Sequence, residues 1–437
     1  MEKNNNRIAF FTGTATLATA GILSRIIGFF YKIFLSRTIG AEGLGIYQLI
    51  FPVMAICFAL TSAGIQTSIS RFVSRENGIG NLSGARCYLL VGLCISVFLS
   101  FFLGLFLWNY ADIIATIFLG EPRCAPMLKI LAFSYLPCSI HSCINGYYYG
   151  LKKAFVPSLS QLIEQIVRIL SVYFIYLIAQ SEGRSISFSL AIFGIVFGEI
   201  AGMLVALSAI GISHSSGNPF LCAKSLLQMA VPLTLSRLIL TFSSCIENIL
   251  IPYKLRIFGY STTEALSVYG ILTGMAISII LFPTVLTNSV SVLLLPVVSE
   301  AQSKNNRFLI KKAIKLTVES CLLLGSCCSV VLLLTGNFIG NFIFRNALAG
   351  TFITTLCWIC PFLYLTNTLN SIFHGLGKAA ITLFLNLLSC AIRIVFISFL
   401  VPIIGIKGYL TGLFVSQCVS CVSALVLLYK SVNNTIT

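Results

Sequence analysis

Four arginines lie inside long apolar runs of the sequence, where an isolated charge is costly. They are Arg25, Arg168, Arg237 and Arg393. Arg25 and Arg237 share a context, since each ends the tripeptide LSR, at 23–25 and 235–237. Two guanidinium groups that face one hydrated space form a multidentate receptor for phosphate or pyrophosphate. We therefore interpret Arg25 and Arg237 as phosphate-binding residues; the alternative is that each neutralises a nearby carboxylate or helix-end carbonyls.

The second pair, Arg168 and Arg393, lies in the related stretches VRIL and IRIV. Glu164 precedes Arg168 by four residues, so the two side chains share a helix face and we expect an ion pair between them. Ser389 takes the corresponding position before Arg393. For this pair, a substrate-binding role and a structural role in charge neutralisation both stay open.

Three further carboxylates, Glu199, Glu247 and Glu319, fall within expected membrane spans. A carboxylate in a hydrated cavity binds Na⁺ or a proton, or acts as the counter-ion of an arginine, and both roles are open for these three and for Glu164. Glu247 lies ten residues after Arg237, about 15 Å along a helix, so these two cannot pair directly. Lys32, two turns beyond the first arginine, is a further candidate for lining a substrate cavity.

The elements that must position these residues are long apolar helices. The chain is 57% hydrophobic and 9% charged, whereas soluble proteins carry about 25% charged residues. A membrane span needs about 20 apolar residues, and we expect twelve of them, at 8–35, 46–70, 86–108, 127–149, 158–179, 188–210, 225–252, 266–294, 313–336, 351–374, 380–404 and 407–429. The first run is too long for a cleaved signal peptide, so we expect it to be a span.

The net charge of +16 indicates loops that meet anionic lipid heads rather than a nucleic-acid partner. More Lys and Arg fall in cytoplasmic segments when the N-terminus is placed in the cytoplasm. We therefore expect both termini in the cytoplasm of a multi-pass protein. The 16 cysteines are scattered through apolar runs and are expected to pack as small hydrophobes. His141 and His374 are expected to be packing or hydrogen-bonding residues.

The two halves of the chain repeat each other. The stretch 145-NGYYYGLKKA-154 aligns with 370-NSIFHGLGKA-379 at an offset of 225 residues (370 minus 145), and the same offset aligns Arg168 with Arg393. Tyr47 aligns with Tyr269 at a nearly equal offset of 222 residues (269 minus 47). These ordered matches predict a duplicated six-helix unit, with an N-terminal lobe at 1–215 and a C-terminal lobe at 216–437. Binding sites in repeated transporters lie near the interface of the repeats.

No enzyme motif is present: there is no P-loop, no HExxH, no serine elbow and no acidic pair in a cytoplasmic loop. We therefore expect no catalytic residue, no cofactor and no metal site. An all-α integral membrane protein that binds or transports a molecule fits the sequence best.

Two stretches carry a family resemblance, SRIIGFFYKIFLSRTIGAEGLGIYQLIFP at 24–52 and YGILTGMAISIILFPTVLTNSVSVLLLPVVSEAQ at 269–302. They resemble the stage V sporulation protein B and polysaccharide flippase family, within the exporter superfamily that also holds lipid II flippases and multidrug extrusion transporters. The resemblance implies two pseudo-symmetric lobes, a V-shaped cavity and alternating access. It also implies an undecaprenyl-pyrophosphate-linked saccharide as substrate, moved from the inner to the outer leaflet of the bacterial cytoplasmic membrane for peptidoglycan, spore-cortex or polysaccharide synthesis. Arg25 matches the SR-x-x-GF arginine that lines the cavity in lipid II flippases.

The sequence departs from lipid II flippases at two places. Tyr31-Lys32 stands where they have an Arg-Asp pair, and Phe58-Ala59 stands where they have adjacent arginines. Two alternatives stay open: an ion-coupled antiporter of organic cations, whose cavity would be acidic, and a non-transporting scaffold of cell-wall synthesis. The expected partners are the lipid-linked saccharide, the bilayer, a coupling ion (Na⁺ or H⁺) and cell-wall synthesis proteins, and no nucleic acid.

Overall fold

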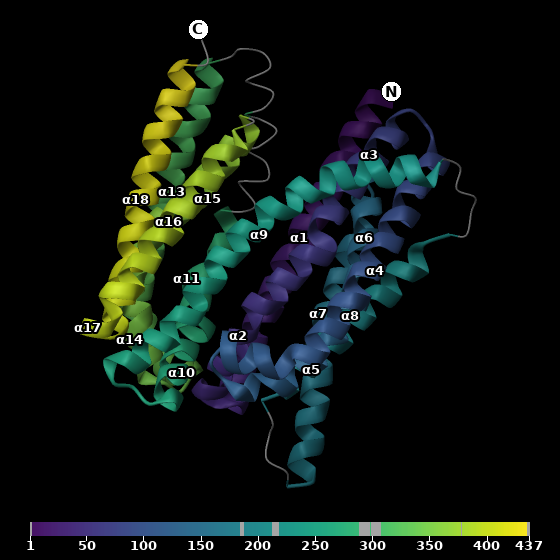
Figure 1. The fold of residues 1–437 in the computed structure, drawn as a ribbon. Helices are drawn as coiled ribbons and strands as arrows, with labels where there is room; N and C mark the ends of the chain where they lie inside the picture. The colour runs from purple at the N-terminus through teal and green to yellow at the C-terminus, as the bar shows by residue number, and fades with distance from the viewer. Residues whose placement is uncertain are drawn as a thin grey trace. The chain divides into compact units, whose positions relative to one another are not determined.

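The computed structural model describes residues 2–183, 188–211, 218–287, 298, 307–376 and 378–434, and all regular structure in these ranges is helical (Figure 1). Among the described residues, eleven helices are long and apolar enough to cross a membrane, and a bent helix pair adds a twelfth. The all-α membrane architecture with about twelve spans is therefore confirmed. The last part of the expected span 266–294 lies outside the described residues.

Eight α-helices make up the first repeat: α1 (Glu2–Thr38), α2 (Gly40–Phe58), α3 (Gly64–Gly78), α4 (Leu82–Ile113), α5 (Ala125–Ala132), α6 (Tyr135–Gly150), α7 (Phe155–Ser181) and α8 (Leu190–Ala209). The described helices of the second repeat are α9 (Pro219–Phe258), α10 (Thr262–Gly270), α11 (Ile277–Leu281), α13 (Arg307–Phe338), α14 (Ala347–Leu356), α15 (Cys360–Gly375), α16 (Ala379–Phe399), α17 (Val401–Ile404) and α18 (Ile406–Asn434). Short π-helical turns extend several of these helices, at Ala59–Ala63, Ile114–Phe118, Ile271–Ala276 and Ile339–Ile343.

The duplication is visible in local structure. The π-turns at 114–118 and 339–343 are 225 residues apart (339 minus 114), as are α6 and α15. After each π-turn the chain passes through a left-handed residue, Gly120 at φ 66° and Arg345 at φ 53°. A non-glycine residue is uncommon in that conformation. Arg345 therefore retains a turn geometry that the first repeat builds with glycine.

By internal contacts the chain forms two compact units. Unit 1 contains Met1–Tyr31 and Leu49–Phe242, and unit 2 contains Lys32–Gln48 and Ser243–Thr437. Glycines explain why the segment 32–48 packs within unit 2: a Cβ on Gly45 would lie 2.0 Å from the carbonyl oxygen of Leu266 on α10. Only a residue without a side chain permits this approach. The lobes expected at 1–215 and 216–437 describe the sequence repeat and stay a prediction.

The fourth helix is broken, which differs from the continuous span expected at 127–149. Helix α5 and helix α6 meet at a bend of 51°. Pro137 has no N–H to donate to the carbonyl of Phe133, so the helix cannot continue unchanged through this point. The second repeat breaks at the same place, where a 3₁₀ turn separates α14 from α15. There Pro361 cannot donate to the carbonyl of Cys357, which accepts instead from the N–H of Cys360 and from the hydroxyl of Ser329 at 2.7 Å.

Candidate functional site

Unit 1 contains a mostly buried ion pair on α7. The guanidinium of Arg168 donates to the carboxylate of Glu164, one turn earlier on the same helix. Their side chains are 18% and 13% exposed. The ion pair predicted from the four-residue spacing is therefore present.

A histidine and a second carboxylate extend this pair into a cluster. The Nδ1 atom of His141 on α6 lies 3.7 Å from the Oε2 atom of Glu199 on α8. The Nε2 atom of His141 is 2.7 Å from the amide nitrogen of Asn145. Because an amide nitrogen can only donate, Nε2 accepts, and the proton of a neutral ring is on Nδ1. The hydroxyl of Ser160 lies 3.0 Å from the same Nε2 atom and 3.3 Å from the Oδ1 atom of Asn145.

Glycines on α8 bring the cluster together. Gly194, Gly198 and Gly202 recur every four residues and so form a stripe on one face of the helix. A Cβ on Gly198 would lie 2.9 Å from the carbonyl oxygen of Glu164, and one on Gly202 would lie 3.2 Å from the ring of His141. Small residues let membrane helices pack at close range. The stripe therefore places Glu199 beside the residues of α6 and α7.

The arrangement in unit 1 can hold a cation. His141, Glu164 and Glu199 each offer one ligand atom, and these atoms lie within 4.8 Å of one another. Arg168 balances one carboxylate, so the cluster with a neutral histidine carries one net negative charge. A buried net charge favours uptake of one positive charge, either a proton or a monovalent cation. A divalent ion would leave the cluster with a net positive charge. The expectation that the chain holds no metal stays a prediction.

Unit 2 contains the repeat-equivalent arginine in a different setting. The Nε atom of Arg393 on α16 donates to the Oε1 atom of Glu247 on α9 at 2.8 Å. A second donor of Arg393 reaches the hydroxyl of Ser389 at 2.8 Å. The hydroxyl of Tyr409 on α18 donates to the same Glu247 oxygen at 2.7 Å. One arginine and one carboxylate balance, and their neighbours satisfy them with hydrogen bonds.

The other candidate residues lie elsewhere. Arg25 on α1 and Arg237 on α9 both belong to unit 1, and both have exposed side chains. The ammonium of Lys32 donates to the hydroxyl of Ser278 at 2.9 Å, in unit 2. Glu319 is exposed on α13, with its carboxylate 3.8 Å from the ammonium of Lys315. The structure thus brings together Arg168, Glu164 and Glu199, and separately Arg393 and Glu247.

Sequence reasoning gave no role to two members of these clusters, Ser160 and Tyr409. The prediction that His141 is a packing or hydrogen-bonding residue is confirmed by its contacts with Asn145 and Ser160, but its proximity to Glu199 was not predicted. A signal for a polar cluster was available: His141 and Asn145 are two polar residues one turn apart in an apolar span. Tyr409 gives no comparable signal, because a tyrosine near a span end is common at membrane interfaces.

Comparisons with known proteins agree with this architecture. Residues 10–302 match the family described as polysaccharide biosynthesis protein, and the chain belongs to this family. Stage V sporulation protein B of Bacillus subtilis is 27% identical over 413 residues, which cover 91% of this chain and 79% of that protein. Lipid II flippase MurJ of Bacillus subtilis is 26% identical over 204 residues, covering 44% of this chain and 38% of that protein.

One solved structure extends the likeness to the fold. The inward-facing conformation of a multidrug resistance MATE family transporter of the MOP superfamily matches with a TM-score of 0.73. The match covers 95% of this chain and 96% of that one at 15% identity. At this identity the likeness shows the fold alone. The protein is thus a multi-pass membrane protein with the fold of a MOP-superfamily transporter.

Proposed function

We propose, with membership of the polysaccharide biosynthesis protein family as the premise, that the protein is a lipid-linked saccharide flippase. It moves an undecaprenyl-pyrophosphate-linked saccharide from the inner to the outer leaflet of the bacterial cytoplasmic membrane, with both of its own termini in the cytoplasm. The similarity to a lipid II flippase and to a sporulation protein supports a cargo used for peptidoglycan, including that of the spore cortex, or for a related polysaccharide.

The observation that carries the proposal is the exposure of two arginines, Arg25 and Arg237, within membrane-spanning helices. Arg168 and Arg393 are held in ion pairs inside their units. Arg25 and Arg237 are exposed, although each lies in the apolar part of a membrane-spanning helix. A pyrophosphate crossing about 30 Å of hydrocarbon needs cations that replace its hydration shell. We assign that role to Arg25 and Arg237, and a structural role to Arg168 and Arg393.

The transport cycle in this proposal is alternating access of the lobes 1–215 and 216–437. The saccharide head enters a hydrated space while the polyprenyl tail stays in lipid, and rocking of the lobes exposes the head to the other side. Lys32 lies on α1 two turns beyond Arg25 and is a further candidate for the path of the head.

The coupling ion binds, in this proposal, at Glu199 and His141. Their cluster carries one net negative charge, so uptake of H⁺ or Na⁺ neutralises it. Glu247 is not assigned this role, because Arg393 and Tyr409 already occupy one of its oxygens. Glu319 is exposed beside Lys315 and is not assigned it either.

The test is flipping by purified protein in proteoliposomes that contain a fluorescent lipid-linked saccharide in the inner leaflet. Each guanidinium–phosphate contact contributes a charge-assisted hydrogen bond, so Arg25→Ala with Arg237→Ala should slow appearance at the outer face about tenfold or more. Arg25→Lys with Arg237→Lys keeps the charge and is the matched control, with a smaller loss. Normal flipping by the double alanine variant would refute the assignment.

The same vesicles distinguish the alternative functions. A scaffold would show no flipping in the wild-type protein. An antiporter of organic cations would export a cationic dye in a manner that depends on Glu199 or Glu247, and Arg25→Ala would leave that export intact.

A further inference from the structure

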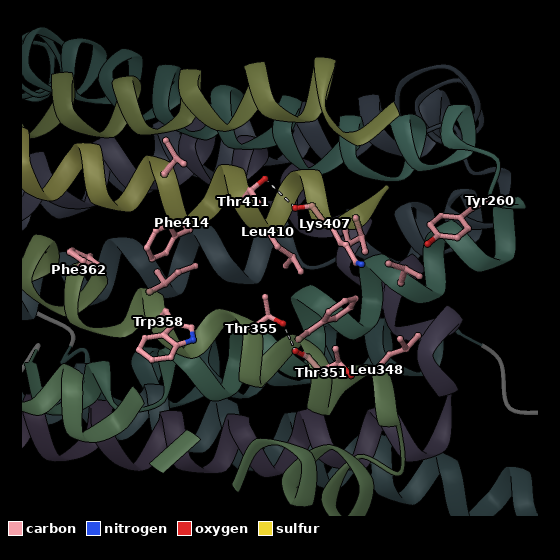
Figure 2. A pocket seen from close by; sticks show the side chains of 15 residues that line it. Tyr260, Leu348, Thr351, Thr355, Trp358, Phe362, Lys407, Leu410, Thr411 and Phe414 are labelled. Atoms are coloured by element: carbon pink, nitrogen blue, oxygen red, sulfur yellow. Dashed lines mark hydrogen bonds between the residues drawn. The ribbon is translucent and has the colours of Figure 1, made fainter. Parts of the chain in front are cut away.

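Unit 2 contains an apolar pocket that the proposed function does not use. Its volume is about 940 Å³, and its walls come from α10, α14, α15 and α18 (Figure 2). This volume is at the upper end of the range of small-molecule sites in proteins. One end is aromatic, with Trp358, Phe362 and Phe414. Figure 2 shows Tyr260 and Lys407 together at the opposite end.

The lining of the pocket extends over about the thickness of one membrane leaflet. Its charged end lies where α10, α14 and α18 begin, at Tyr260, Leu348 and Lys407. In the predicted orientation these three helix starts are on the outer side. From Leu348 to Phe362 the chain advances 14 residues (362 minus 348), or about 20 Å of helical rise. Half of a hydrocarbon core of about 30 Å is comparable.

The wall below the charged end is effectively apolar, even where it contains threonines. The hydroxyl of Thr411 donates to the carbonyl of Gly408 at 2.8 Å. The hydroxyl of Thr355 donates to the carbonyl of Thr351 at 2.8 Å, and that of Thr351 to the carbonyl of Ala347 at 3.3 Å. Hydroxyl hydrogens that are bonded to the helix backbone are not available to a ligand. The pocket thus offers methyl groups, aliphatic chains and rings.

The charged end offers one cation. Lys407 is exposed, and within the part of the chain that the structure describes its ammonium makes no hydrogen bond or ion pair. A lysine at a membrane surface attracts anionic lipid. The hydroxyl of Tyr260 adds a possible donor at the same end.

We propose that this pocket binds one acyl chain of an anionic phospholipid from the outer leaflet, with the lipid phosphate against the ammonium of Lys407. Length favours this occupant over the polyprenyl tail of the proposed substrate, because an extended undecaprenyl chain is longer than the pocket. The bound chain fills the space between α14 and α18 and so supports unit 2 from within.

The two tryptophans of the chain, Trp108 and Trp358, provide the test. Trp358 lines the pocket and is 57% exposed, whereas Trp108 lies on α4 in unit 1 and is 44% exposed. Trp108→Phe and Trp358→Phe each leave one fluorophore. Each variant is reconstituted in phosphatidylcholine vesicles that contain either phosphatidylglycerol or phosphatidylcholine with a brominated acyl chain, since bromine quenches a tryptophan that it contacts.

We expect brominated phosphatidylglycerol to quench Trp358 at a mole fraction about fivefold lower than brominated phosphatidylcholine does. Trp108 should show no such preference. Lys407→Gln should abolish the preference at Trp358, while Lys254→Gln, in the same unit but outside the pocket, should retain it. Thr355→Phe fills the pocket and should reduce quenching by both lipids without changing thermal stability in detergent.

Three results would overturn the proposal. Equal quenching of Trp358 by both brominated lipids would show that no anionic site is present. If Trp358 in the Lys407→Gln variant is still quenched preferentially by brominated phosphatidylglycerol, the lipid phosphate binds somewhere other than Lys407. Displacement of brominated phosphatidylglycerol by undecaprenyl phosphate, at a lower mole fraction than by unlabelled phosphatidylglycerol, would identify the polyprenyl lipid as the occupant.

Discussion

Arg168 in unit 1 and Arg393 in unit 2 occupy equivalent positions of the repeat and are buried to a similar degree, with 18% and 16% of the side chain exposed. They differ in where the counter-ion comes from. Arg168 pairs with Glu164 on its own helix, and Arg393 pairs with Glu247, 146 residues away on α9. Both repeats thus contain a mostly buried guanidinium. In unit 1 a carboxylate on the same helix neutralises it, and in unit 2 a carboxylate on a different helix does so.

The difference has a consequence for charge. In unit 1 the local pair leaves Glu199 beside His141 as a second carboxylate, and the cluster can accept a cation. In unit 2 the carboxylate of Glu247 is bonded to Arg393 and Tyr409, and the charges of these described residues balance. The equivalent arginines therefore lie in different settings: a cluster with a second carboxylate in unit 1, and a charge-balanced cluster that joins α9, α16 and α18 in unit 2.

The largest effect should come from breaking the ion pair between Arg393 on α16 and Glu247 on α9. Arg393→Ala leaves Glu247 buried and uncompensated, which should destabilise the protein by about 3–5 kcal/mol. Thermal unfolding in detergent measures this loss. Glu247→Gln with Arg393→Met removes both charges and should be much less harmful. If the single and double variants unfold at the same temperature, the pair has no structural role.

A carboxylate on α16 itself should restore the stability of unit 2 if Arg393 can be neutralised from its own helix as well as from α9. Ser389 lies four residues before Arg393, as Glu164 does before Arg168, and its hydroxyl already accepts from the guanidinium. Ser389→Glu added to Glu247→Gln should therefore recover about half of the stability that Glu247→Gln loses. Absence of any recovery, with Ser389→Glu alone well folded, would show that the unit 2 arginine requires a partner from α9.

An intermediate effect should follow from separating α7 and α8. Gly198→Ala places a Cβ 2.9 Å from the carbonyl oxygen of Glu164, so it should cost about 2 kcal/mol. Gly28→Ala on α1 is the matched control, because a Cβ there meets nothing within 4 Å. The alanine at position 28 should leave the unfolding temperature unchanged or raise it slightly. Equal behaviour of the two variants would contradict close packing at Gly198.

The smallest effect concerns ion binding. A cation that binds the native state at about ten times its Kd stabilises it by about 1.4 kcal/mol. Two titrations test this: raising the Na⁺ concentration at fixed pH, and lowering the pH at fixed Na⁺ concentration. The unfolding temperature of the wild type should rise in the titration whose ion the cluster binds. Glu199→Gln should abolish that response, with choline chloride as the salt control. If Glu247→Gln abolishes it and Glu199→Gln does not, the assignment of the two sites is reversed.

The sequence correctly predicted the features that depend on residues close to one another in the chain. Hydropathy marks spans because a helix in lipid must be apolar over about 20 residues, and the span count was confirmed. The four-residue spacing sufficed for Glu164 and Arg168, because helix geometry alone places them on one face. The break between α5 and α6 was missed, since hydropathy does not register a proline that interrupts the helical hydrogen bonds.

The sequence by itself determined the membrane class, the repeat and the pairing within α7. Only the tertiary structure decided that Glu247 pairs with Arg393, that His141 meets Glu199 across two helices, and that Lys407 ends an apolar pocket. The reason is physical: helix periodicity fixes neighbours three or four residues apart. Partners on different helices depend on which faces pack, and glycines such as Gly198 set that packing through close approaches that do not follow from the residue order.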